Sequence, residues 1–327
     1  MKAAAGRPRP SRPRTAVITG ASSGIGLATA LAFARADYQL ILAARGADAL
    51  DRAAARCRNL GAQALAVPTD VTDADAVRDL VRRARAEWGP VDVWVSNVGV
   101  GAFGPYEATP MEAHDQVIRT NLIAHMNEAH AIVPVFKEQG HGTFINMVSL
   151  GAFAPAPFAA AYSASKFGLR GFSEALRAEL STHPGIHVCD VYPGFVDTPG
   201  LSHSANYSGG RLTAPPPLLD ARRVAAAVLK VARNPRATTM VGSVAHAARL
   251  AHCLAPNLMG RAGAWAIRAY LARAGSRPIQ DGNLFRPSAG PGRIDGGLRR
   301  WSEQARAASV AGAILLGAWA LRRLARR

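Results

Sequence analysis

Short apolar runs alternate with longer segments of helical periodicity along the first two thirds of the chain. Strands are expected over 15–19, 38–44, 64–69, 91–96, 143–149 and 186–192, and helices over 24–36, 47–60, 74–88, about 111–138 and about 161–181. Strands that alternate with helices predict βαβ units and a parallel sheet covered on both faces. Because such crossovers are right-handed, the pattern predicts an α/β fold with a doubly wound sheet.

The last third of the chain departs from this alternation. Residues 199–220 are rich in Gly, Ser and Pro and are expected to form a loop after the sixth strand. The pattern then predicts a helix over 221–233, a last strand over 238–244, helical structure over 245–273 and a Gly/Pro-rich linker over 286–299. These segments extend a single main domain by a C-terminal helical part.

Composition narrows the class of protein. A chain of 327 residues, 49% of them hydrophobic, is long enough to bury a large core without disulfides or metals. Its three cysteines, Cys57, Cys189 and Cys253, are too few and too widely spaced for a disulfide framework or a zinc module, which fits a reducing compartment such as the cytoplasm. The histidines show no ligand spacing, so no metal site is predicted.

The formal net charge of +17 is unevenly distributed. Residues 199–298 carry 13 basic side chains and only three acidic ones. Such a surface favours an anionic partner, such as nucleic acid, an anionic lipid surface or an acidic substrate. A merely solvated, arginine-rich surface is the alternative. No recognition helix, zinc site or basic-aromatic sheet motif occurs, which argues against a nucleic-acid partner.

The two ends of the chain have distinct compositions. Residues 1–13 lack the apolar centre of a signal peptide. They are rich in Pro and Arg and are expected to form a disordered basic arm. Residues 307–321 are uncharged and lead into a cluster of four arginines. This stretch is shorter than the roughly 20 residues of a spanning helix. It favours attachment to a membrane surface from the cytoplasmic side, and a terminal helix docked on the protein is the alternative.

The segment Thr19–Gly26 (TGASSGIG) lies between the first strand and the first helix. Gly20 permits the tight turn, Gly24 lets the backbone approach a pyrophosphate, and Gly26 lets the helix pack closely on the sheet. The helix N-terminus then presents N–H groups and the positive end of its dipole to phosphate. A dinucleotide site is therefore predicted at this turn, which also includes Ser22, Ser23 and Ile25.

The second strand ends in Ala43-Ala44-Arg45. An NAD site usually has a carboxylate at this place, where it accepts a hydrogen bond from the ribose 2′-hydroxyl. A guanidinium instead pairs with a 2′-phosphate. Arg45 therefore predicts NADP(H) as the cofactor in preference to NAD.

Tyr162 and Lys166 are four residues apart and lie on one face of the predicted helix. A tyrosine with a pKa of about 10 is a poor acid–base group at neutral pH. A nearby ammonium is expected to stabilise the phenolate and to lower the pKa of Tyr162. Ser149, at the end of the preceding strand, is a donor that could hold a carbonyl oxygen.

With these motifs, the chain resembles a classical short-chain dehydrogenase/reductase, a family with a Rossmann-like fold. The turn Thr19–Gly26, Asp70, Asn97, Gly99, Asn121, Ser149, Tyr162, Lys166 and Pro193-Gly194 occur in the family's order and approximate spacing. The resemblance implies a catalytic domain over about 14–245. Beyond it lie a helical extension and linker over 246–305 and a tail over 306–327. Because this extension is foreign to the family's common core, the usual tetramer is not assured, and another homo-oligomer is left open.

The resemblance also assigns roles to individual residues. Tyr162 would exchange a proton with the substrate oxygen, Lys166 would lower the pKa of Tyr162 and bind the nicotinamide ribose, and Ser149 would orient the carbonyl. Asn121 would hold a water of the proton relay. Asp70 and Val71 would flank the adenine, Asn97 and Gly99 would line the cofactor site, and Pro193, Gly194 and Thr198 would border the nicotinamide.

The expected function is that of an NADP(H)-dependent oxidoreductase that interconverts a carbonyl and a secondary alcohol. A lipophilic substrate is expected from the apolar C-terminal helices and from the aromatic residues Phe153, Phe158, Phe195 and Tyr207. A 3-oxoacyl-carrier reductase is a variant of this interpretation. A non-catalytic, nucleotide-sensing membrane adaptor is an alternative from another class. An epimerase or dehydratase on nucleotide sugars shares the Tyr-x-x-x-Lys spacing but usually has a different glycine turn.

Overall fold

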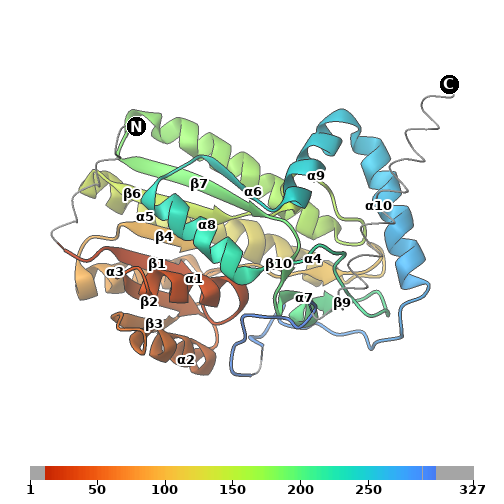
Figure 1. Ribbon diagram of the computed structural model, residues 1–327, viewed down its shortest axis with the longest axis horizontal. Helices are drawn as coiled ribbons and strands as arrows, with labels where there is room; N and C mark the ends of the chain where they lie inside the picture. The colour runs from red at the N-terminus through yellow and green to blue at the C-terminus, as the bar shows by residue number, and fades with distance from the viewer. Residues whose placement is uncertain (1–11, 289, 300–327) are drawn as a thin grey trace, which may run out of the picture.

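The computed structural model describes residues 12–288 and 290–299, and its centre is a seven-stranded parallel sheet (Figure 1). The strand order is β3–β2–β1–β4–β6–β7–β11. The strands of this sheet are β1 (Thr15–Thr19), β2 (Gln39–Ala44), β3 (Ala64–Pro68), β4 (Val93–Ser96), β6 (Gly142–Met147), β7 (Ile186–Pro193) and β11 (Thr238–Val241). The predicted doubly wound, Rossmann-like α/β fold is confirmed.

Helices cover both faces of the sheet. One face carries α1 (Gly24–Ala34), α2 (Ala47–Arg58) and α8 (Ala221–Arg233), and the other carries α3 (Ala74–Trp88), α4 (Met111–Ile118), α5 (Ala124–Gln139) and α6 (Ala160–Glu179). Successive strand residues point to opposite faces. Ile18 and Leu42 therefore join the core under α1 and α8, whereas Val17 and Ile41 join the core under α3 and α5.

Three predicted elements differ from those observed. The long helix predicted over 111–138 is interrupted by a π-helical turn at Arg119–Ile123. The last strand ends at Val241, and α9 (Ser243–Leu254) begins two residues later. The helical region after 245 divides at Ala255, because the α conformation is disfavoured for a residue before proline. The helix α10 (Pro256–Leu271) then starts with Pro256.

The remaining elements are short and lie at one end of the molecule. They are β5 (Ala102–Phe103) paired with β9 (Ala205–Asn206), β8 (Val196–Asp197) paired with β10 (Leu219–Asp220), the helix α7 (Gly200–His203), and the 3-10 turns Leu150–Ala152 and Leu180–Thr182. The predicted loop 199–220 therefore contains a helical turn and two strand pairings.

The chain ends contribute to the packing where they are described. Arg12, which was assigned to the basic arm, donates two hydrogen bonds to the carboxylate of Asp92, at 3.0 and 3.1 Å. The predicted membrane-attached tail, 306–327, lies outside the described residues. Among the residues that are described, no helix has both the length and the apolar character needed to cross a membrane.

Candidate active site at the carboxyl edge of the sheet

The chemically competent residues lie at the carboxyl ends of β1, β4, β6 and β7. In a doubly wound sheet, ligands bind at this edge, at the point where the strand order reverses. Here the order reverses between β1 and β4. The glycine turn follows β1, Asn97 and Gly99 follow β4, Ser149 follows β6, and Gly194 follows β7. The fold therefore gathers residues from four distant parts of the sequence at one edge.

The glycine turn has the geometry that its sequence predicts. Gly20 and Gly24 have φ angles of +61° and +53°, which disfavour other residues. A Cβ on Gly26 would lie 2.1 Å from the carbonyl oxygen of Gly20, so only glycine fits there. The Nδ2 atom of Asn97 donates to the carbonyls of Thr19 and Gly20, at 3.3 and 3.4 Å. The turn is thereby held open beside the N-terminus of α1, as a dinucleotide cradle requires.

Tyr162 and Lys166 lie one turn apart on α6, and Ser149 contacts the same tyrosine. The hydroxyls of Ser149 and Tyr162 share a hydrogen bond. The Nζ atom of Lys166 lies 5.9 Å from the centre of the Tyr162 ring and donates to the carbonyl of Met147 at 3.2 Å. The phenol and the amine are thus on the same side of the molecule, next to the end of β6.

Asn121 lies in the π-helical turn and is completely buried. Its Oδ1 accepts from the backbone N–H of Val100 at 2.8 Å, and its Nδ2 donates to the carbonyl of Val100 at 2.9 Å. A Cβ on Gly99 would lie 3.7 Å from Asn121 Oδ1 and 4.0 Å from Lys166 Nζ. The turn therefore orients Asn121 toward the same small volume as Lys166, a placement typical of π-turns at functional sites.

Burial shifts the pKa values of the two central groups in opposite directions. Burial raises the pKa of Tyr162, and the hydrogen bond with Ser149 only partly opposes it. Burial also lowers the pKa of Lys166 to about 8, because the charged amine is separated from water. The expected lowering of the Tyr162 pKa by Lys166 is therefore corrected: in this geometry desolvation dominates, and the phenol holds its proton at neutral pH.

The residues expected at the adenine and nicotinamide ends occupy the same edge. Asp70 is exposed after β3, and its carboxylate accepts hydrogen bonds from the backbone N–H and hydroxyl of Thr72. Val71 beside it is buried. Pro193 ends β7, and the N–H of Gly194 donates to Val241 at 3.0 Å. Thr198 reaches the glycine turn, since a Cβ on Gly24 would meet its Cβ at 3.4 Å.

Arg45 follows β2 beside the glycine turn, where the N–H of Ala21 donates to the carbonyl of Ala43 at 3.1 Å. Its guanidinium donates to the carbonyls of Asn283 and Leu284, at 2.6 and 3.3 Å. Arg45 thus lies next to the glycine turn. Its present partners come from a segment that the sequence pattern described only as a linker.

This segment, residues 281–288 and 290–299, is called the strap below. It runs back across the carboxyl edge of the sheet (Figure 1). The carbonyl of Arg293 accepts from the N–H of Gly24 at 2.8 Å, and the carbonyl of Gly290 accepts from Arg52 at 2.9 Å. Leu284 is completely buried in a cluster that also includes Tyr207 and the half-buried Tyr162. The strap therefore contacts both ends of the candidate site.

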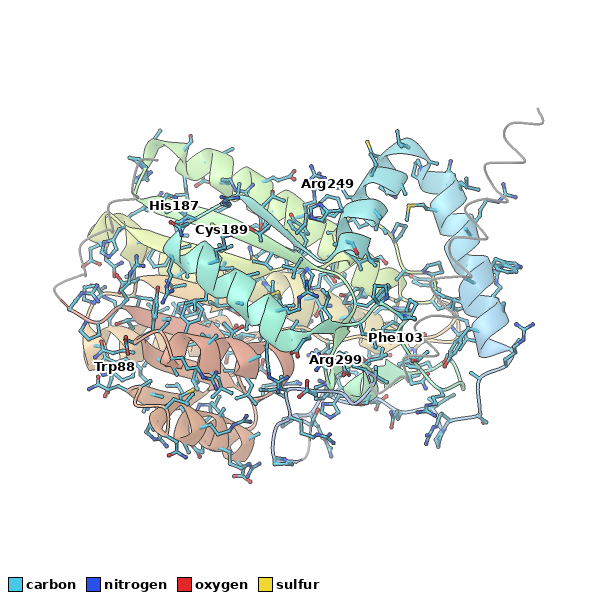
Figure 2. All side chains as sticks on the ribbon, viewed as in Figure 1. Trp88, Phe103, His187, Cys189, Arg249 and Arg299 are labelled. Carbon is cyan, nitrogen blue, oxygen red and sulfur yellow. The ribbon has the colours of Figure 1, made fainter. Side chains whose placement is uncertain are left out.

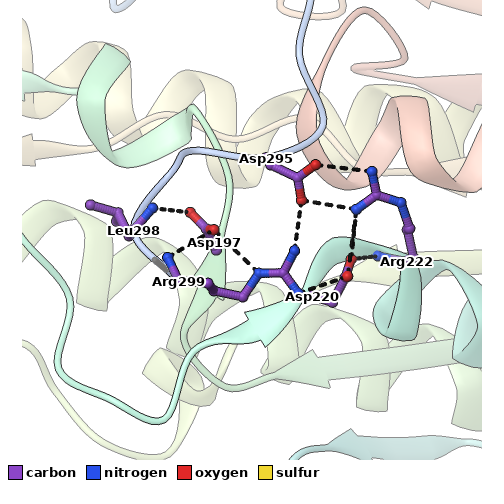
Figure 3. A network of polar contacts seen from close by, with 6 residues as sticks. All are labelled: Asp197, Asp220, Arg222, Asp295, Leu298 and Arg299. Atoms are coloured by element: carbon purple, nitrogen blue, oxygen red, sulfur yellow. Dashed lines mark hydrogen bonds and ion pairs between the residues drawn. The ribbon is translucent and has the colours of Figure 1, made fainter. Parts of the chain in front are cut away.

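An ion-pair network holds the end of the strap (Figure 3). The nearly buried carboxylate of Asp197 accepts from the backbone N–H groups of Leu298 and Arg299, at 2.9 and 3.1 Å. The Arg299 guanidinium binds Asp197, Asp220 and Asp295 at once. Arg222 closes the network with two hydrogen bonds to Asp295, each 2.9 Å. These contacts hold the pKa of Asp295 below its usual range, chiefly through hydrogen bonding to Arg222.

A buried polar group below the glycine turn was missed from the sequence. Glu128 on α5 is completely buried and accepts from the Trp94 indole at 2.5 Å and from the Thr19 hydroxyl at 3.2 Å. Burial raises the pKa of Glu128 to about 8. A signal did exist, because Glu128 stands between Ala124 and Ile132 on the apolar face of its helix, where a carboxylate needs partners.

His125, one residue earlier, was also missed. Its Nδ1 lies 2.7 Å from the Ser96 hydroxyl and 2.9 Å from Asn146 Oδ1, and its Nε2 lies 3.1 Å from the carbonyl of Val98. Burial, followed by the charge of Lys166, lowers the pKa of His125 to about 4. Ser96, at the end of β4, therefore has a buried histidine as its partner.

These residues fit a nicotinamide dinucleotide. The glycine cradle, the helix N-terminus behind it and Arg45 at the adenosine end form a continuous edge that leads to Ser149, Tyr162 and Lys166. The strap carbonyls already occupy the N–H of Gly24 and the Arg45 guanidinium. A phosphate that binds these two donors therefore requires the strap to shift.

Comparisons with known proteins agree with this geometry. Residues 14–207 match the family described as short chain dehydrogenase. A 1-deoxy-11-beta-hydroxypentalenate dehydrogenase from Streptomyces exfoliatus is 41% identical over 57% of this chain and 68% of its own length. A ketoacyl reductase, HetN, from Nostoc sp. is 30% identical over 68% of this chain and 76% of its own length.

Solved structures are also similar to this chain. An alcohol dehydrogenase from the archaeon Thermococcus sibiricus, complexed with 5-hydroxy-NADP, is 30% identical with a TM-score of 0.62 and covers 72% of this chain and 98% of that one. A metagenomic short-chain oxidoreductase in complex with NADP is 28% identical with a TM-score of 0.60, over 70% and 96% of the two chains. The chain belongs to the short-chain dehydrogenase family of nicotinamide-dependent oxidoreductases.

Proposed function

We propose that the protein is an NADP(H)-dependent oxidoreductase that interconverts a carbonyl and a secondary alcohol on a lipophilic substrate. The observation that carries this proposal is the convergence of Ser149, Tyr162 and Lys166 beside the glycine turn. NADPH, when bound, supplies the hydride. The protein positions the reactants and supplies the proton.

The proton is proposed to come from Tyr162. Burial raises the pKa of this phenol, so at neutral pH it carries the proton that a reduced carbonyl oxygen requires. The Ser149 hydroxyl, which already shares a hydrogen bond with Tyr162, is placed to donate to the same oxygen. Lys166, with a pKa lowered to about 8, is the proposed group that reprotonates the phenol, and Asn121 would hold a water of the proton relay.

NADP(H) is the proposed cofactor because Arg45 stands at the adenosine end of the site and no acid takes its place. Gly20, Ser22, Ser23, Gly24, Ile25, Gly26, Asp70, Val71, Asn97, Gly99, Pro193, Gly194 and Thr198 complete the proposed cofactor site.

A lipophilic substrate is supported by the side chains around the site. Tyr207 and Phe153 are buried near Tyr162 and Ser149, and Tyr207 belongs to the same apolar cluster as Tyr162. A surface hollow of about 260 Å³ lies between Phe158, Tyr106 and α10 at the same end of the molecule. The similarity to a hydroxypentalenate dehydrogenase and to a ketoacyl reductase points to the same substrate class.

The experiment is to follow NADPH oxidation with a panel of apolar ketones, aldehydes and 3-oxoacyl thioesters, in the wild type and in Tyr162→Phe. Loss of the proton donor is expected to lower kcat by roughly 10²-fold or more, whereas NADPH binding, measured by fluorescence, is retained. If neither protein turns over any carbonyl and both bind NADPH equally, the protein is a nucleotide-sensing scaffold.

A 3-oxoacyl-carrier reductase remains a specific candidate within this class. The supporting observation is that residues 199–298 carry 13 basic side chains and three acidic ones, which suits an acidic carrier. To test for carrier recognition, reduction rates are compared for a carrier-bound thioester and for the same acyl group attached to a short thiol. A much higher kcat/KM for the carrier-bound form, lost at high ionic strength, would establish carrier recognition.

A further inference from the structure

The hairpin of α9 and α10 exposes large apolar side chains. Four of them have exposed fractions of 62%, 75%, 68% and 73%: Leu250, Leu254, Leu258 and Trp265. Most leucines in the sheet and its covering helices are buried. Leu250 and Leu254 are four residues apart on α9, and Leu258 and Trp265 are seven apart on α10. Each pair therefore lies on one side of its helix. These four residues, together with Cys253 and Arg261, are called the hairpin face.

The opposite side of the hairpin is seated on the rim of the candidate site. Ala245 of α9 is completely buried, and α9 packs against the turn Leu150–Ala152, which directly follows Ser149. Arg249 points from α9 toward the body of the molecule (Figure 2), and its guanidinium lies 5.3 Å from the Phe153 ring. The Arg268 guanidinium of α10 lies 6.0 Å from the Phe158 ring. The hairpin is thus anchored, and the hairpin face is its outer side.

The charged side chains of the hairpin itself all have one sign. Residues 221–280 contain no Asp or Glu. Arg261, between Leu258 and Trp265, and Arg273 at the end of α10 are exposed. The helical spacing places Arg261 beside the line through Leu258 and Trp265, and Arg273 lies in the turn that follows α10. Arginine stems cover apolar surface while their charged ends reach outward, an arrangement suited to the boundary between headgroups and acyl chains.

We propose that the hairpin face docks on an anionic lipid bilayer. Leucine and tryptophan would enter the interface, and the arginines would be attracted to the phosphate groups of the lipids. A second copy of the chain fits less well, because two identical faces without acidic residues would bring like charges together. Docking would place the Ser149 rim next to the bilayer, and this last consequence rests on the proposed function.

The native cysteines allow a direct test on the full chain. Cys253 is exposed within the hairpin face, whereas Cys57 and Cys189 are buried. A polarity-sensitive dye attached to Cys253 is expected to shift to shorter wavelength with vesicles of 3:1 phosphatidylcholine and phosphatidylglycerol, and to stay unchanged with phosphatidylcholine alone. Added salt should reverse the shift. The readout needs no activity, so its failure leaves the proposed function untouched.

Variants separate the hairpin from other parts of the chain. Leu250→Ser, Leu254→Ser, Leu258→Ser and Trp265→Ser combined should lower vesicle affinity at least tenfold in sedimentation. A matched control, Met111→Ser with Leu60→Ser, removes exposed apolar side chains elsewhere and should change nothing. Deletion of 303–327 should leave the dye shift intact. Unchanged sedimentation of the hairpin variant would overturn the proposal. So would a dye shift that appears in solution, without vesicles, as the chain dimerises or binds an acidic protein.

Discussion

Tyr162 and Lys166 show how burial, more than proximity, sets the acid–base state of the site. The phenol has a raised pKa and the amine has a pKa lowered to about 8, so burial favours the neutral form of both side chains. A protonated phenol suits carbonyl reduction, and an amine that titrates near pH 8 can pass its proton on. Sequence spacing places the two residues on one helix face, but it contains no information on how far they are separated from water.

Arg45 carries a prediction on cofactor choice. Arg45→Asp replaces a cation with an anion beside the 2′-position of adenosine, so the ratio of kcat/KM for NADPH to that for NADH should fall by about 10²-fold or more, consistent with loss of a charge-assisted pair. Steady-state kinetics with both cofactors measures it. Arg52→Ala serves as the control, because Arg52 also donates to a strap carbonyl but is not assigned to the 2′-position. A wild type that prefers NADH would contradict the assignment.

Glu128 carries a prediction on stability. Its pKa is raised to about 8 in the folded protein and is about 4.3 in the unfolded chain. At a pH between these two values the folded protein keeps a proton on Glu128 that the unfolded chain has lost. Its contribution is fully present below the unfolded pKa and is lost as the pH rises toward 8. Glu128→Gln, which resembles the protonated acid, should therefore gain stability relative to wild type from pH 5 to pH 8 in denaturant unfolding. A constant difference over this range would show that Glu128 does not titrate there.

At the scale of elements, sequence periodicity was sufficient for the sheet but not for the strap. Alternate residues of β1 and β2 enter opposite cores, and this pattern is visible in their near-continuous apolar sequence. The strap contacts Gly24, Arg45 and Arg52 through backbone carbonyls. Carbonyls are common to all residues, so a Gly/Pro-rich stretch gives no side-chain pattern from which such contacts could be predicted.

The contacts of the strap predict that it competes with the cofactor for its binding site. Arg299→Ala removes the guanidinium that joins Asp197, Asp220 and Asp295, and should free the strap end. Because strap carbonyls compete for Gly24 and Arg45, a larger open fraction should speed NADPH association severalfold and lower the apparent Kd in proportion. Stopped-flow fluorescence measures both quantities.

A second ion pair provides the control for this experiment. Arg85→Ala breaks the exposed contact with Glu138, far from the strap, and should leave both quantities unchanged. Weaker NADPH binding by Arg299→Ala would mean that the strap holds the cofactor in place instead of competing with it.

The features proposed to carry function are concentrated at one end of the whole molecule. The candidate site, the strap network and the α9–α10 hairpin all lie at the carboxyl end of the sheet (Figure 1), and the hairpin belongs to the acid-free stretch 221–280. The sequence showed that the basic charge is concentrated late in the chain. Only the fold shows that the α9–α10 hairpin lies beside a site built from residues before 200. This placement depends on contacts between segments that are far apart in the sequence.

The position of the strap in the sequence also has a consequence during synthesis of the protein on the ribosome. Gly24 and Arg45 are made before Asn283, Leu284 and Arg293, which bind them. All strands of the sheet, which ends with β11 at Val241, precede these partners in the sequence. During that interval the nucleotide cradle faces the cell's dinucleotide pool without the strap, so newly made protein can acquire its cofactor before the finished chain restricts entry.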